Sequence, residues 1–323
     1  MTGRSIAIMT DEVGWHTRQL QAALRARGCI GRCVDLADCR IDTQAAWHGL
    51  VIPGFGRELP DAALVRGIAS GTFEQVTKRL GVLHLLRELG VPVYNDARAI
   101  ERSVDKSMTS LLLHTAGIPT PPTWTTESQA HAQRIAMREG AAGHPLVLKP
   151  LFGSQGKGLR LVGHVDGVHH ALPALGKAYG GLAYLQRFVP PLARPGFDWR
   201  VLVVGGRAVT AMRRISEHWV HNVAQGARCT AADLAPDLAP GLARWAERAA
   251  QVLGLDYAGV DLMPSGATTV GGIQVIEVNG VAAWRGLQGV TGFNIARAIV
   301  DDLLDRKLAI SDAGRPSVEP RSA

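Results

Sequence analysis

Two apolar segments near the end of the chain carry three oxygen-bearing side chains. Asp261 lies in the run Tyr-Ala-Gly-Val-Asp-Leu-Met, and Glu277 and Asn279 lie in the run Gln-Val-Ile-Glu-Val-Asn-Gly. Their Val, Ile, Leu and Tyr neighbours favour strands, and residues two apart on a strand face the same side. Two carboxylates and an amide oxygen that meet between neighbouring strands suit a hard cation. The pattern therefore predicts a Mg²⁺ site, and the usual partner of such an ion is a nucleotide phosphate.

A loop earlier in the chain has the composition of a phosphate cradle. It follows an expected strand at 145–149 that ends with Lys149, and it contains Gly153, Ser154, Gly156 and Gly158. Glycines let backbone N–H groups approach phosphate oxygens closely, and a serine hydroxyl can donate one more hydrogen bond. The loop has no GxxxxGK(S/T) pattern and is therefore not a Walker A motif. The alternative is a plain glycine hairpin with two exposed lysines.

The order of the expected elements divides the chain into an α/β part and a mixed part. In the first part, short apolar strands alternate with helices, which predicts a parallel α/β domain. These strands are expected at 5–9, 32–36, 49–53 and 91–94, and the helices at 16–27 and 73–89. In the second part, helices are expected at 105–116, 127–139, 242–253 and 295–304. Gly205 and Gly206 separate two further strands and predict a hairpin.

Together, the glycine loop and the acidic strands resemble the ATP-grasp superfamily, whose fold holds ATP between two α+β lobes. The resemblance covers residues 103–304, and the segment before it is similar to the family's Rossmann-like pre-ATP-grasp domain. It implies a pre-ATP-grasp domain at 1–102, a central lobe with the glycine loop at 103–189 and a C-terminal lobe with the Mg²⁺ site at 190–310. The residues from 311 to 323 are rich in Pro, Ser and Arg, which predicts a disordered tail.

The resemblance also implies which residues contact the nucleotide and the metal. Lys106 and Lys149 match the family's two nucleotide lysines, and the run 184–189 matches the interlobe linker that holds the adenine. The implied ATP-binding residues are Lys106, Lys149, Gly153, Ser154, Gly156, Gly158, Gln186, Arg187, Phe188, Val189 and Asp198. Asp261, Glu277 and Asn279 match the ligands of one or two Mg²⁺ ions, with Mn²⁺ as an alternative.

Three further side chains are expected to contact the acceptor, the phosphates or the reaction intermediates. Arg200 lies two residues from Asp198 on one strand face, and the two are similar to the family's basic and acidic pair. Arg200 and Arg214 are expected to stabilise an acyl phosphate and a tetrahedral intermediate, which the arginine fork suits. Asn222 is expected to contact the acceptor or a phosphate. The alternatives are solvated strand arginines and a turn-forming asparagine.

Within the superfamily, the chain is most similar to the group of α-L-glutamate ligases that includes the ribosomal protein S6 modification enzyme. Relatives in that group add glutamate to tetrahydromethanopterin or to a deazaflavin cofactor. The runs 81–93, 149–154 and 277–279 carry this resemblance. The chain departs from it at Arg187, where a glutamate is common, and at Val220, which replaces an arginine two residues before Asn222. His221 between them is expected to be a polar surface residue rather than a base.

The resemblance implies an ATP-dependent carboxylate–amine ligase that forms an amide through an acyl phosphate. The expected partners are ATP, L-glutamate or a similar amino acid, and a carboxylate-bearing small molecule such as a tetrahydromethanopterin-type pterin. Two alternatives stay open. The first is a glutamate ligase that modifies a protein C-terminus, and the second is a non-catalytic nucleotide-binding protein. The chain is also expected to form a homo-oligomer.

Composition limits the other classes of partner. The formal charge is +7, yet aromatic residues make up only 5% of the 323 residues and no run rich in Lys and Arg is present, which disfavours a nucleic-acid binder. No apolar run approaches the roughly 18 residues that a membrane span needs. The four cysteines complete no zinc pattern and are expected to be ordinary reduced thiols, as in a cytoplasmic protein.

Overall fold

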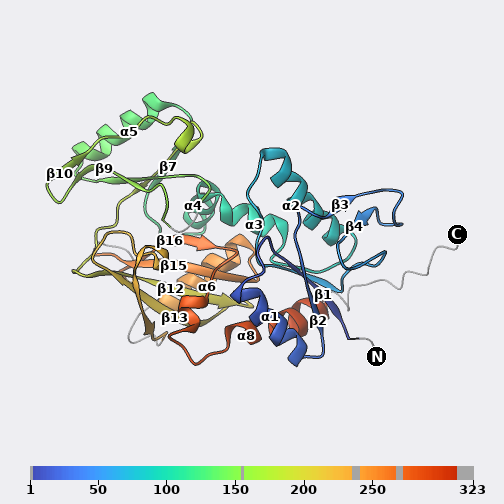
Figure 1. Ribbon diagram of the computed structural model, residues 1–323. Coiled ribbons are helices and arrows are strands. Elements are labelled where there is room, and N and C mark those ends of the chain that lie inside the picture. Colours follow the sequence, from blue (N-terminus) through green and yellow to red (C-terminus); the bar gives the residue numbers. More distant parts are fainter. Residues whose placement is uncertain (1–2, 154–155, 235–240, 267–271, 311–323) are drawn as a thin grey trace.

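The computed structural model describes residues 3–153, 156–234, 241–266 and 272–310. The expected cradle residue Ser154 and the expected tail at 311–323 therefore lie outside the described residues. Three sheets form the body of this part of the chain (Figure 1).

The N-terminal sheet is parallel and has the strand order β2-β1-β5-β6. Its strands are β1 (Ser5–Met9), β2 (Ile30–Val34), β5 (Ala62–Val65) and β6 (Val93–Tyr94). The helices of this region are α1 (Trp15–Ala26), α2 (Phe73–Glu88) and α3 (Ala97–Val104). The expected parallel α/β arrangement is confirmed.

One expected strand of this sheet was wrong. Residues 49–53 contribute only β4 (Leu50–Val51), which pairs with β3 (Arg40–Ile41) in a separate antiparallel pair. The third strand of the parallel sheet is β5, whose run Ala-Ala-Leu-Val is fully buried. Two of its four residues are alanines, which are depleted in strands, so β5 has a weak sequence signal.

The central lobe is built on a second sheet with the order β10-β9-β8-β11-β7. The strands are β7 (Thr123–Thr126), β8 (Leu146–Lys149), β9 (Arg160–Val165), β10 (Val168–His170) and β11 (Ala183–Arg187). The helices are α4 (Lys106–Thr115), α5 (Gln129–Ala141) and the short η1 (Lys177–Tyr179). The Asp105 side chain caps α4 by accepting hydrogen bonds from the N–H groups of Ser107 and Met108, and it thereby fixes where Lys106 begins the helix.

The C-terminal lobe is built on a third, antiparallel sheet with the order β14-β13-β12-β15-β16. The strands are β12 (Gly196–Val204), β13 (Arg207–Ser216), β14 (Arg228–Ala232), β15 (Tyr257–Pro264) and β16 (Ile273–Asn279). The helical elements are η2 (Val223–Gln225), α6 (Leu242–Leu253), α7 (Arg285–Gln288), α8 (Ile295–Asp302) and η3 (Leu303–Leu308). Gly205 and Gly206 have φ values of 59° and 80° and form the predicted hairpin turn.

The two faces of the third sheet have different partners. Val201, Val203 and Val260 pack with α6 in one hydrophobic cluster. Leu202 and Tyr257 point to the other face and join a cluster with residues of β1, β5, α1 and α8. The N-terminal sheet and the C-terminal lobe thus share a core, whereas the central lobe has a small cluster of its own. Figure 1 shows α1 and α8 side by side and the central lobe set apart above them.

One buried side chain links the N-terminal domain to the start of β15 and to the residue that follows β16. Asn95 is fully buried, and its amide nitrogen donates to the carbonyl oxygens of Tyr257 and Gly280 at 2.7 and 2.6 Å. Its amide oxygen accepts hydrogen bonds from the N–H groups of Asp256 and Tyr257. Because all of its hydrogen-bonding groups are satisfied, Asn95 holds β15 and the segment after β16 in a fixed position.

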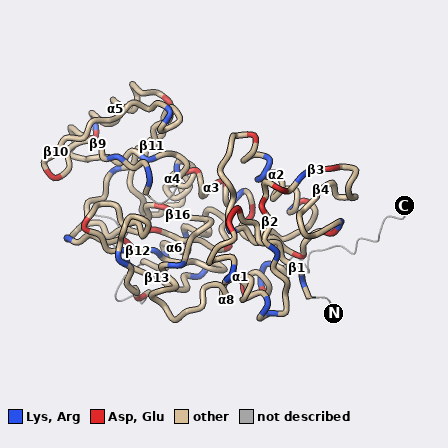
Figure 2. The backbone as a smooth tube through the Cα atoms, in the orientation of Figure 1, with Lys and Arg blue, Asp and Glu red and all other residues tan. Residues whose placement is uncertain are grey.

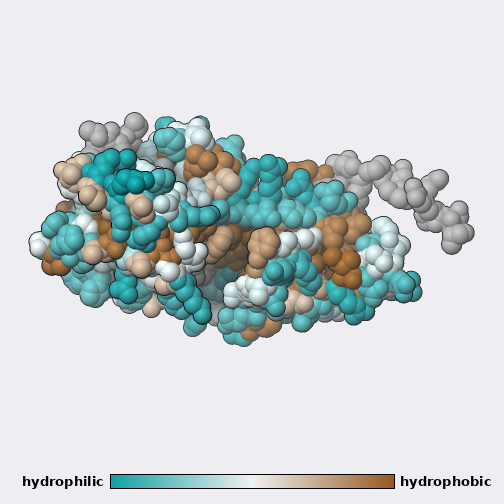
Figure 3. All heavy atoms as spheres, turned by 90° about the horizontal axis from the view of Figure 1, so that it is seen from above, coloured by the Kyte–Doolittle hydropathy of each residue, from teal (hydrophilic) through white to brown (hydrophobic). Residues whose placement is uncertain are grey.

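Two views show the surface and the charges. Figure 3 shows a hollow near the middle of the molecule. Figure 2 shows basic and acidic residues interspersed along the tube. Among the described residues, no helix is both long and apolar enough to cross a membrane.

Candidate active site

Strand register brings five predicted site residues together on one face of the third sheet. Asp198 on β12 lies opposite Arg214 on β13, and Arg200 on β12 lies opposite Asp261 on β15. Asp261 in turn lies opposite Glu277 on β16. Side chains at directly opposed positions of an antiparallel pair are close neighbours. The expected side-by-side placement of Asp198 and Arg200 is therefore found, and Asp261 lies directly opposite Glu277, whereas Asn279 lies opposite Gly259 of β15.

Asp198, Arg214, Asp261 and Arg200 form a continuous buried ion-pair network. Arg214 donates to both carboxylate oxygens of Asp198, from Nε at 2.7 Å and from Nη2 at 2.6 Å. The same Nη2 lies 3.1 Å from Oδ2 of Asp261. Arg200 donates to both oxygens of Asp261, with Nη2 at 2.7 Å from Oδ2. Two carboxylates and two guanidinium groups thus balance each other, as buried charges require.

Burial and pairing set the protonation of the two acids. Burial raises the pKa of Asp198 to about 6, against the opposing effect of Arg214. Burial also disfavours the charged form of Asp261, but Arg200 and Arg214 outweigh it and lower its pKa. Both carboxylates are therefore ionised at neutral pH, and Asp261 is the more acidic of the two.

Glu277 and Asn279 offer oxygen atoms that no donor occupies within the described chain. Within the described chain, the carboxylate of Glu277 forms one ion pair, with the Nζ atom of Lys106 at 4.0 Å. Asn279 donates from its amide nitrogen to Gly259 at 3.4 Å, which leaves its amide oxygen free. No three His, Cys, Asp or Glu side chains of the described residues are placed to hold a metal. A cation at this place would therefore need the amide oxygen of Asn279 as a ligand beside the two acids.

The two predicted nucleotide lysines lie near Glu277 but have neutral hydrogen-bond partners. Lys149 donates to the side-chain oxygen of Gln186 at 2.6 Å, and Lys106 donates to the carbonyl oxygens of Leu151 and Gly153 at 3.3 and 2.9 Å. Burial lowers the pKa of Lys149 to about 8, with Glu277 opposing the shift. Burial also lowers the pKa of Lys106. Each cation would gain from an anion that replaced its neutral partner.

The glycine loop approaches the C-terminal lobe. Gly153, Gly156 and Gly158 all have positive φ, at 142°, 68° and 74°, where other residues are strained. A Cβ atom on Gly156 would lie 2.7 Å from Nε2 of Gln225 and 2.9 Å from Cγ1 of Val220. The loop of the central lobe is thus in contact with the segment between β13 and β14.

A cavity where the two lobes meet gathers most of the predicted residues. Its lining includes Lys149, Gly156, Gln186, Arg187, Phe188, Val189, Asp198, Arg214, Asn222, Asp261 and Glu277. Lys106, Gly153, Gly158, Arg200 and Asn279 do not line it, although Lys106 and Arg200 contact residues that do. The sequence reasoning missed the apolar lining residues Val147, Leu159, Met263 and Ile276. Two of them had a signal, because Val147 and Met263 lie two residues from Lys149 and Asp261 on the same strands.

In the interlobe linker at 184–189, the contacts of Arg187 differ from those expected. The side chain of Arg187 pairs with the buried Glu139 of α5 at 2.6 Å, so its charge is neutralised within the central lobe although the residue lines the cavity. The N–H groups of Arg187 and Phe188 donate to Pro122 and Pro145, whereas the N–H group of Val189 has no partner in the described chain. Asn222 caps the turn η2 through Ala224 while it lines the cavity.

His221 is buried, which corrects the expectation of a surface residue. It is 5% exposed and lines the cavity beside Trp219 and Val220, and its Nε2 atom has no partner in the described structure. Burial, followed by the charge of Arg214, lowers the pKa of His221 to about 4. The ring is therefore neutral at physiological pH and does not add to the positive charge of the site.

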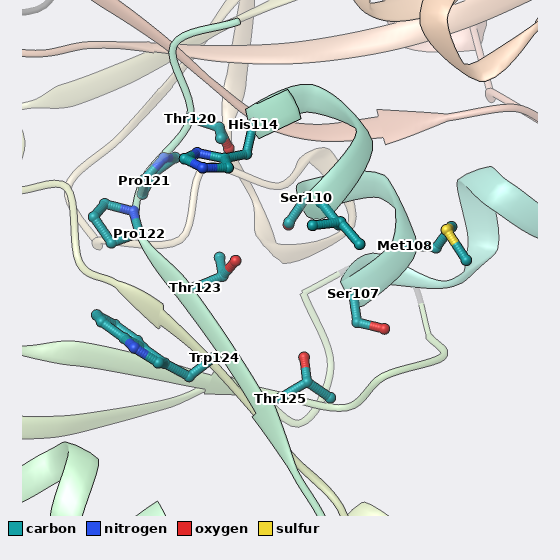
Figure 4. A pocket seen from close by; sticks show the side chains of 11 residues that line it. Ser107, Met108, Ser110, His114, Thr120, Pro121, Pro122, Thr123, Trp124 and Thr125 are labelled. Carbon is teal, nitrogen blue, oxygen red and sulfur yellow. The ribbon is translucent and has the colours of Figure 1, made fainter. Parts of the chain in front are cut away.

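A second cavity lies between α4 and β7 and has a different character. Its volume is about 510 Å³, and Ser107, His114, Thr123 and Trp124 are among its lining residues (Figure 4). None of the described Lys, Arg, Asp or Glu residues lines it. It lacks the charged groups that phosphates and metal ions need, so the interlobe cavity is the candidate active site.

Comparison with known proteins identifies the family of the chain. Residues 103–303 match the model of the RimK-like ATP-grasp domain, and residues 5–100 match the RimK PreATP-grasp domain. A tetrahydromethanopterin:alpha-L-glutamate ligase of Methanosarcina acetivorans is 30% identical, over 91% of this chain and 97% of its own length. A probable alpha-L-glutamate ligase of Hydrogenovibrio crunogenus is 31% identical, over 88% of this chain and 90% of its own length.

Solved structures share the fold. The ATP-grasp ligase PsnB, determined with minimal precursor, Mg and ADP, superposes with a TM-score of 0.68 over 95% of this chain and 99% of its own, at 21% identity. The two family models together span nearly all of the described residues. The protein is thus an ATP-grasp ligase, and the chain belongs to the RimK-like ATP-grasp family.

Proposed function

We propose that this ligase joins L-glutamate to a carboxylate-bearing small molecule, of the tetrahydromethanopterin type, through an acyl phosphate. The observation that carries the proposal is the interlobe cavity, which Lys149 and Glu277 line and beside which Lys106 lies 4.0 Å from Glu277. That arrangement suits the phosphates and metal of Mg·ATP. The identity of the substrates is supported by the relatives, which include a tetrahydromethanopterin:alpha-L-glutamate ligase.

The free oxygens of Glu277 and Asn279, together with Asp261, fit a divalent cation. Bound Mg²⁺, or Mn²⁺ in its place, would neutralise charge on the β- and γ-phosphates of ATP. Asp261 gives both of its oxygens to arginines in this structure. A carboxylate offers about four acceptor sites, and Asp261 uses three of them, so Oδ1 can still bind a cation while it accepts from Arg200. A phosphate oxygen of the nucleotide could accept from the remaining N–H groups of either guanidinium.

The reaction then needs two displacements. The acceptor carboxylate attacks the γ-phosphorus, which forms a new O–P bond and breaks the bond to the leaving ADP. The amine of glutamate next attacks the carbonyl carbon of the acyl phosphate, which forms the C–N bond, releases phosphate and frees a proton. Arg200 and Arg214 would stabilise the charge on these intermediates, and alignment supplies much of the remaining acceleration.

The chain's other residues hold the nucleotide. Lys106 and Lys149 would bind phosphate oxygens and the purine edge, and the loop from Gly153 to Gly158 would cover the phosphates and exclude water. The N–H group of Val189 in the linker has no acceptor in the described chain and would donate to the adenine. Asn222 would contact a phosphate or the acceptor. We place the reaction in the cytoplasm, which the four free cysteines support, and a homo-oligomeric state stays a prediction.

The test is a ligation assay with mass spectrometry. With ATP, Mg²⁺ and L-glutamate, a tetrahydromethanopterin-type acceptor should gain one glutamyl residue, and ADP release should require both substrates. A peptide with the C-terminal sequence of a ribosomal protein is the competing acceptor. Modification of the peptide alone would replace the proposal by a protein-modifying ligase, and product formation with other amino acids only would exclude glutamate.

The metal assignment is tested in the same assay with Glu277→Gln. Loss of one negative charge next to the metal should reduce turnover by about 10²- to 10³-fold at saturating Mg·ATP. Glu58→Gln is the matched control, because Glu58 is exposed on the N-terminal domain. Near-normal turnover of Glu277→Gln, with a thermal midpoint equal to that of the control, would remove Glu277 from the metal site.

A further inference from the structure

The segment directly after Asn279 meets the carboxyl edge of the N-terminal parallel sheet. Arg66 follows β5, and its Nη1 atom donates to the carbonyl oxygen of Val281 at 3.4 Å. Its guanidinium carbon lies 5.3 Å from the centre of the Trp284 ring. The crevice beyond the carboxyl ends of parallel strands is where α/β folds bind ligands. Arg66 therefore lies at an edge of the N-terminal sheet where a ligand could bind, and it contacts the C-terminal lobe there.

Several polar groups at this junction have no partner. Trp284 is 1% exposed, and its Nε1–H forms no hydrogen bond with the described residues, nor does the buried Nε–H of Arg66. A buried donor left unpaired costs about 1–3 kcal/mol. Neither Arg66 nor the exposed Arg285 forms an ion pair within the described chain. Within the described chain, the junction thus has two unpaired donors and two guanidinium groups without a counter-ion.

The first turn of α1 adds to this positive potential. The N-cap residue Gly14 makes no side-chain cap, and the first turn contains no acidic residue. The N–H groups of that turn are unpaired by helix geometry and carry the positive end of the helix dipole. Two carboxylates lie nearby, Glu12 beside Gly14 and Asp11 beside Gly67. Both are exposed, and neither pairs with Arg66 or Arg285.

His16 in that turn fixes the loop without adding charge. Its Nε2 atom accepts hydrogen bonds from the N–H groups of Trp284 and Arg285 at 3.1 and 3.2 Å. Burial, followed by the charges of Arg66 and Arg285, lowers the pKa of His16 to about 4, so the ring is neutral. The cationic groups that are left to bind an anion are Arg66 and Arg285.

The junction is also close to the predicted reaction site. Gly259 of β15 lies between the loop and Arg200, since a Cβ atom there would be 2.8 Å from Cβ of Ala282 and 3.1 Å from Cδ of Arg200. The loop that carries Trp284 and Arg285 therefore packs beside the guanidinium that pairs with Asp261. An anion bound at Arg66 would lie on the side of Arg200 toward the N-terminal domain.

We propose that Arg66 and Arg285, beside the first turn of α1, form a carboxylate-binding site for an organic substrate other than ATP. The site rests on the proposed ligase function and deepens it, because both non-nucleotide substrates of such a reaction carry carboxylates. The bound group is either a carboxylate of the incoming amino acid or a carboxylate of the acceptor that does not react. The arginine fork matches the two oxygens of either one.

Direct binding tests the site without turnover. Titration calorimetry with L-glutamate, and with glutarate as a probe that lacks the amine, is carried out in the presence of Mg²⁺ and a non-hydrolysable ATP analogue. Arg66→Gln and Arg285→Gln should each weaken carboxylate binding about 10- to 100-fold, the value of a charge-assisted hydrogen bond. Affinity for the ATP analogue should stay within about twofold of wild type. Arg66→Lys should restore binding only in part, because lysine keeps the charge and loses the fork.

Arg40→Gln is the control, because Arg40 is an exposed arginine of β3 in the same domain, with its side chain 66% exposed. If Arg66→Gln unfolds the protein because the stacking of Arg66 on Trp284 is lost, Arg285→Gln alone tests the site. A rise in KM for L-glutamate alone assigns the site to the amino acid, and a rise for the acceptor alone assigns it to the acceptor. Unchanged affinity for every carboxylate in both variants, or no carboxylate binding by wild type, overturns the site. Absence of ligation despite such binding overturns only the proposed function.

Discussion

The two lobes that face the interlobe cavity hold their cations in opposite ways. In the central lobe, Lys106 and Lys149 donate to neutral oxygens, and no counter-ion of the described chain lies closer to them than 4.0 Å. In the C-terminal lobe, Arg200 and Arg214 are neutralised by Asp198 and Asp261. The charges of the lysines are available to an added anion, whereas the charges of the arginines are already balanced by carboxylates. The difference separates residues that serve binding from residues that also hold the fold.

The largest expected difference between the lobes is in stability. Arg214→Met leaves the carboxylate of Asp198, which is 3% exposed, without its two hydrogen bonds, and should lower the free energy of unfolding by about 3–5 kcal/mol. Lys149→Met removes a cation without a close counter-ion but leaves the buried side-chain oxygen of Gln186 unpaired, and should lower the free energy of unfolding by only about 1–3 kcal/mol. Denaturant unfolding at pH 7 measures both. The pair Asp198→Leu with Arg214→Met should recover most of the loss, and a double variant no more stable than Arg214→Met would contradict the network.

The second largest expected effect is the pH dependence of nucleotide binding. Because the pKa of Lys149 is lowered to about 8, this lysine loses its charge above pH 8, whereas an ordinary lysine keeps it beyond pH 10. Affinity for Mg·ATP should therefore fall by about tenfold from pH 7 to pH 9. Lys149→Arg should flatten this profile, because arginine stays charged throughout. Equal slopes in wild type and variant would show that Lys149 is not the titrating group.

The smallest expected effect concerns the contact between the lobes. Gly156→Ala places a methyl group against Val220 and Gln225, and should raise the KM for ATP several-fold by holding the glycine loop away from the C-terminal lobe. Gly167→Ala is the matched control, since Gly167 also has positive φ, at 80°, but would meet nothing within 4 Å. Both variants carry a backbone cost of about 1–2 kcal/mol, so stability should fall alike. Equal KM values would show that the contact does not affect the nucleotide.

Local patterns were enough to predict much of the site. Alternation along β15 and β16 placed Asp261, Glu277 and Asn279 on one face, and the distance of two between Asp198 and Arg200 did the same on β12. The salt bridge between Arg187 and Glu139 could not be predicted, because it joins residues 48 positions apart through the packing of α5 against the sheet. The same holds for the burial of His221 and for the junction of Arg66 with Trp284, which depend on the contact between domains. Domain boundaries at 102 and 189 stay predictions.

Helices and strands could be predicted from the spacing of apolar residues where the segment was long and the spacing regular. Helix α6 begins and ends at the predicted residues, and the glycine hairpin lies where it was expected. The strand β5 was missed because four residues, two of them alanine, do not show a period. Its place in the sheet is set by burial on both faces rather than by any local preference.

The shared core of the N-terminal sheet and the C-terminal lobe limits how this enzyme can be divided or recombined. A fragment that began at residue 103 would expose Leu202, Tyr257 and Trp284, which now pack against the N-terminal domain, and would lose the four hydrogen bonds of Asn95. Such a fragment should aggregate. A chimera that exchanged the first hundred residues would keep its solubility only if it also exchanged their partners on β12, β15 and α8. In evolution, therefore, the two regions are expected to change together.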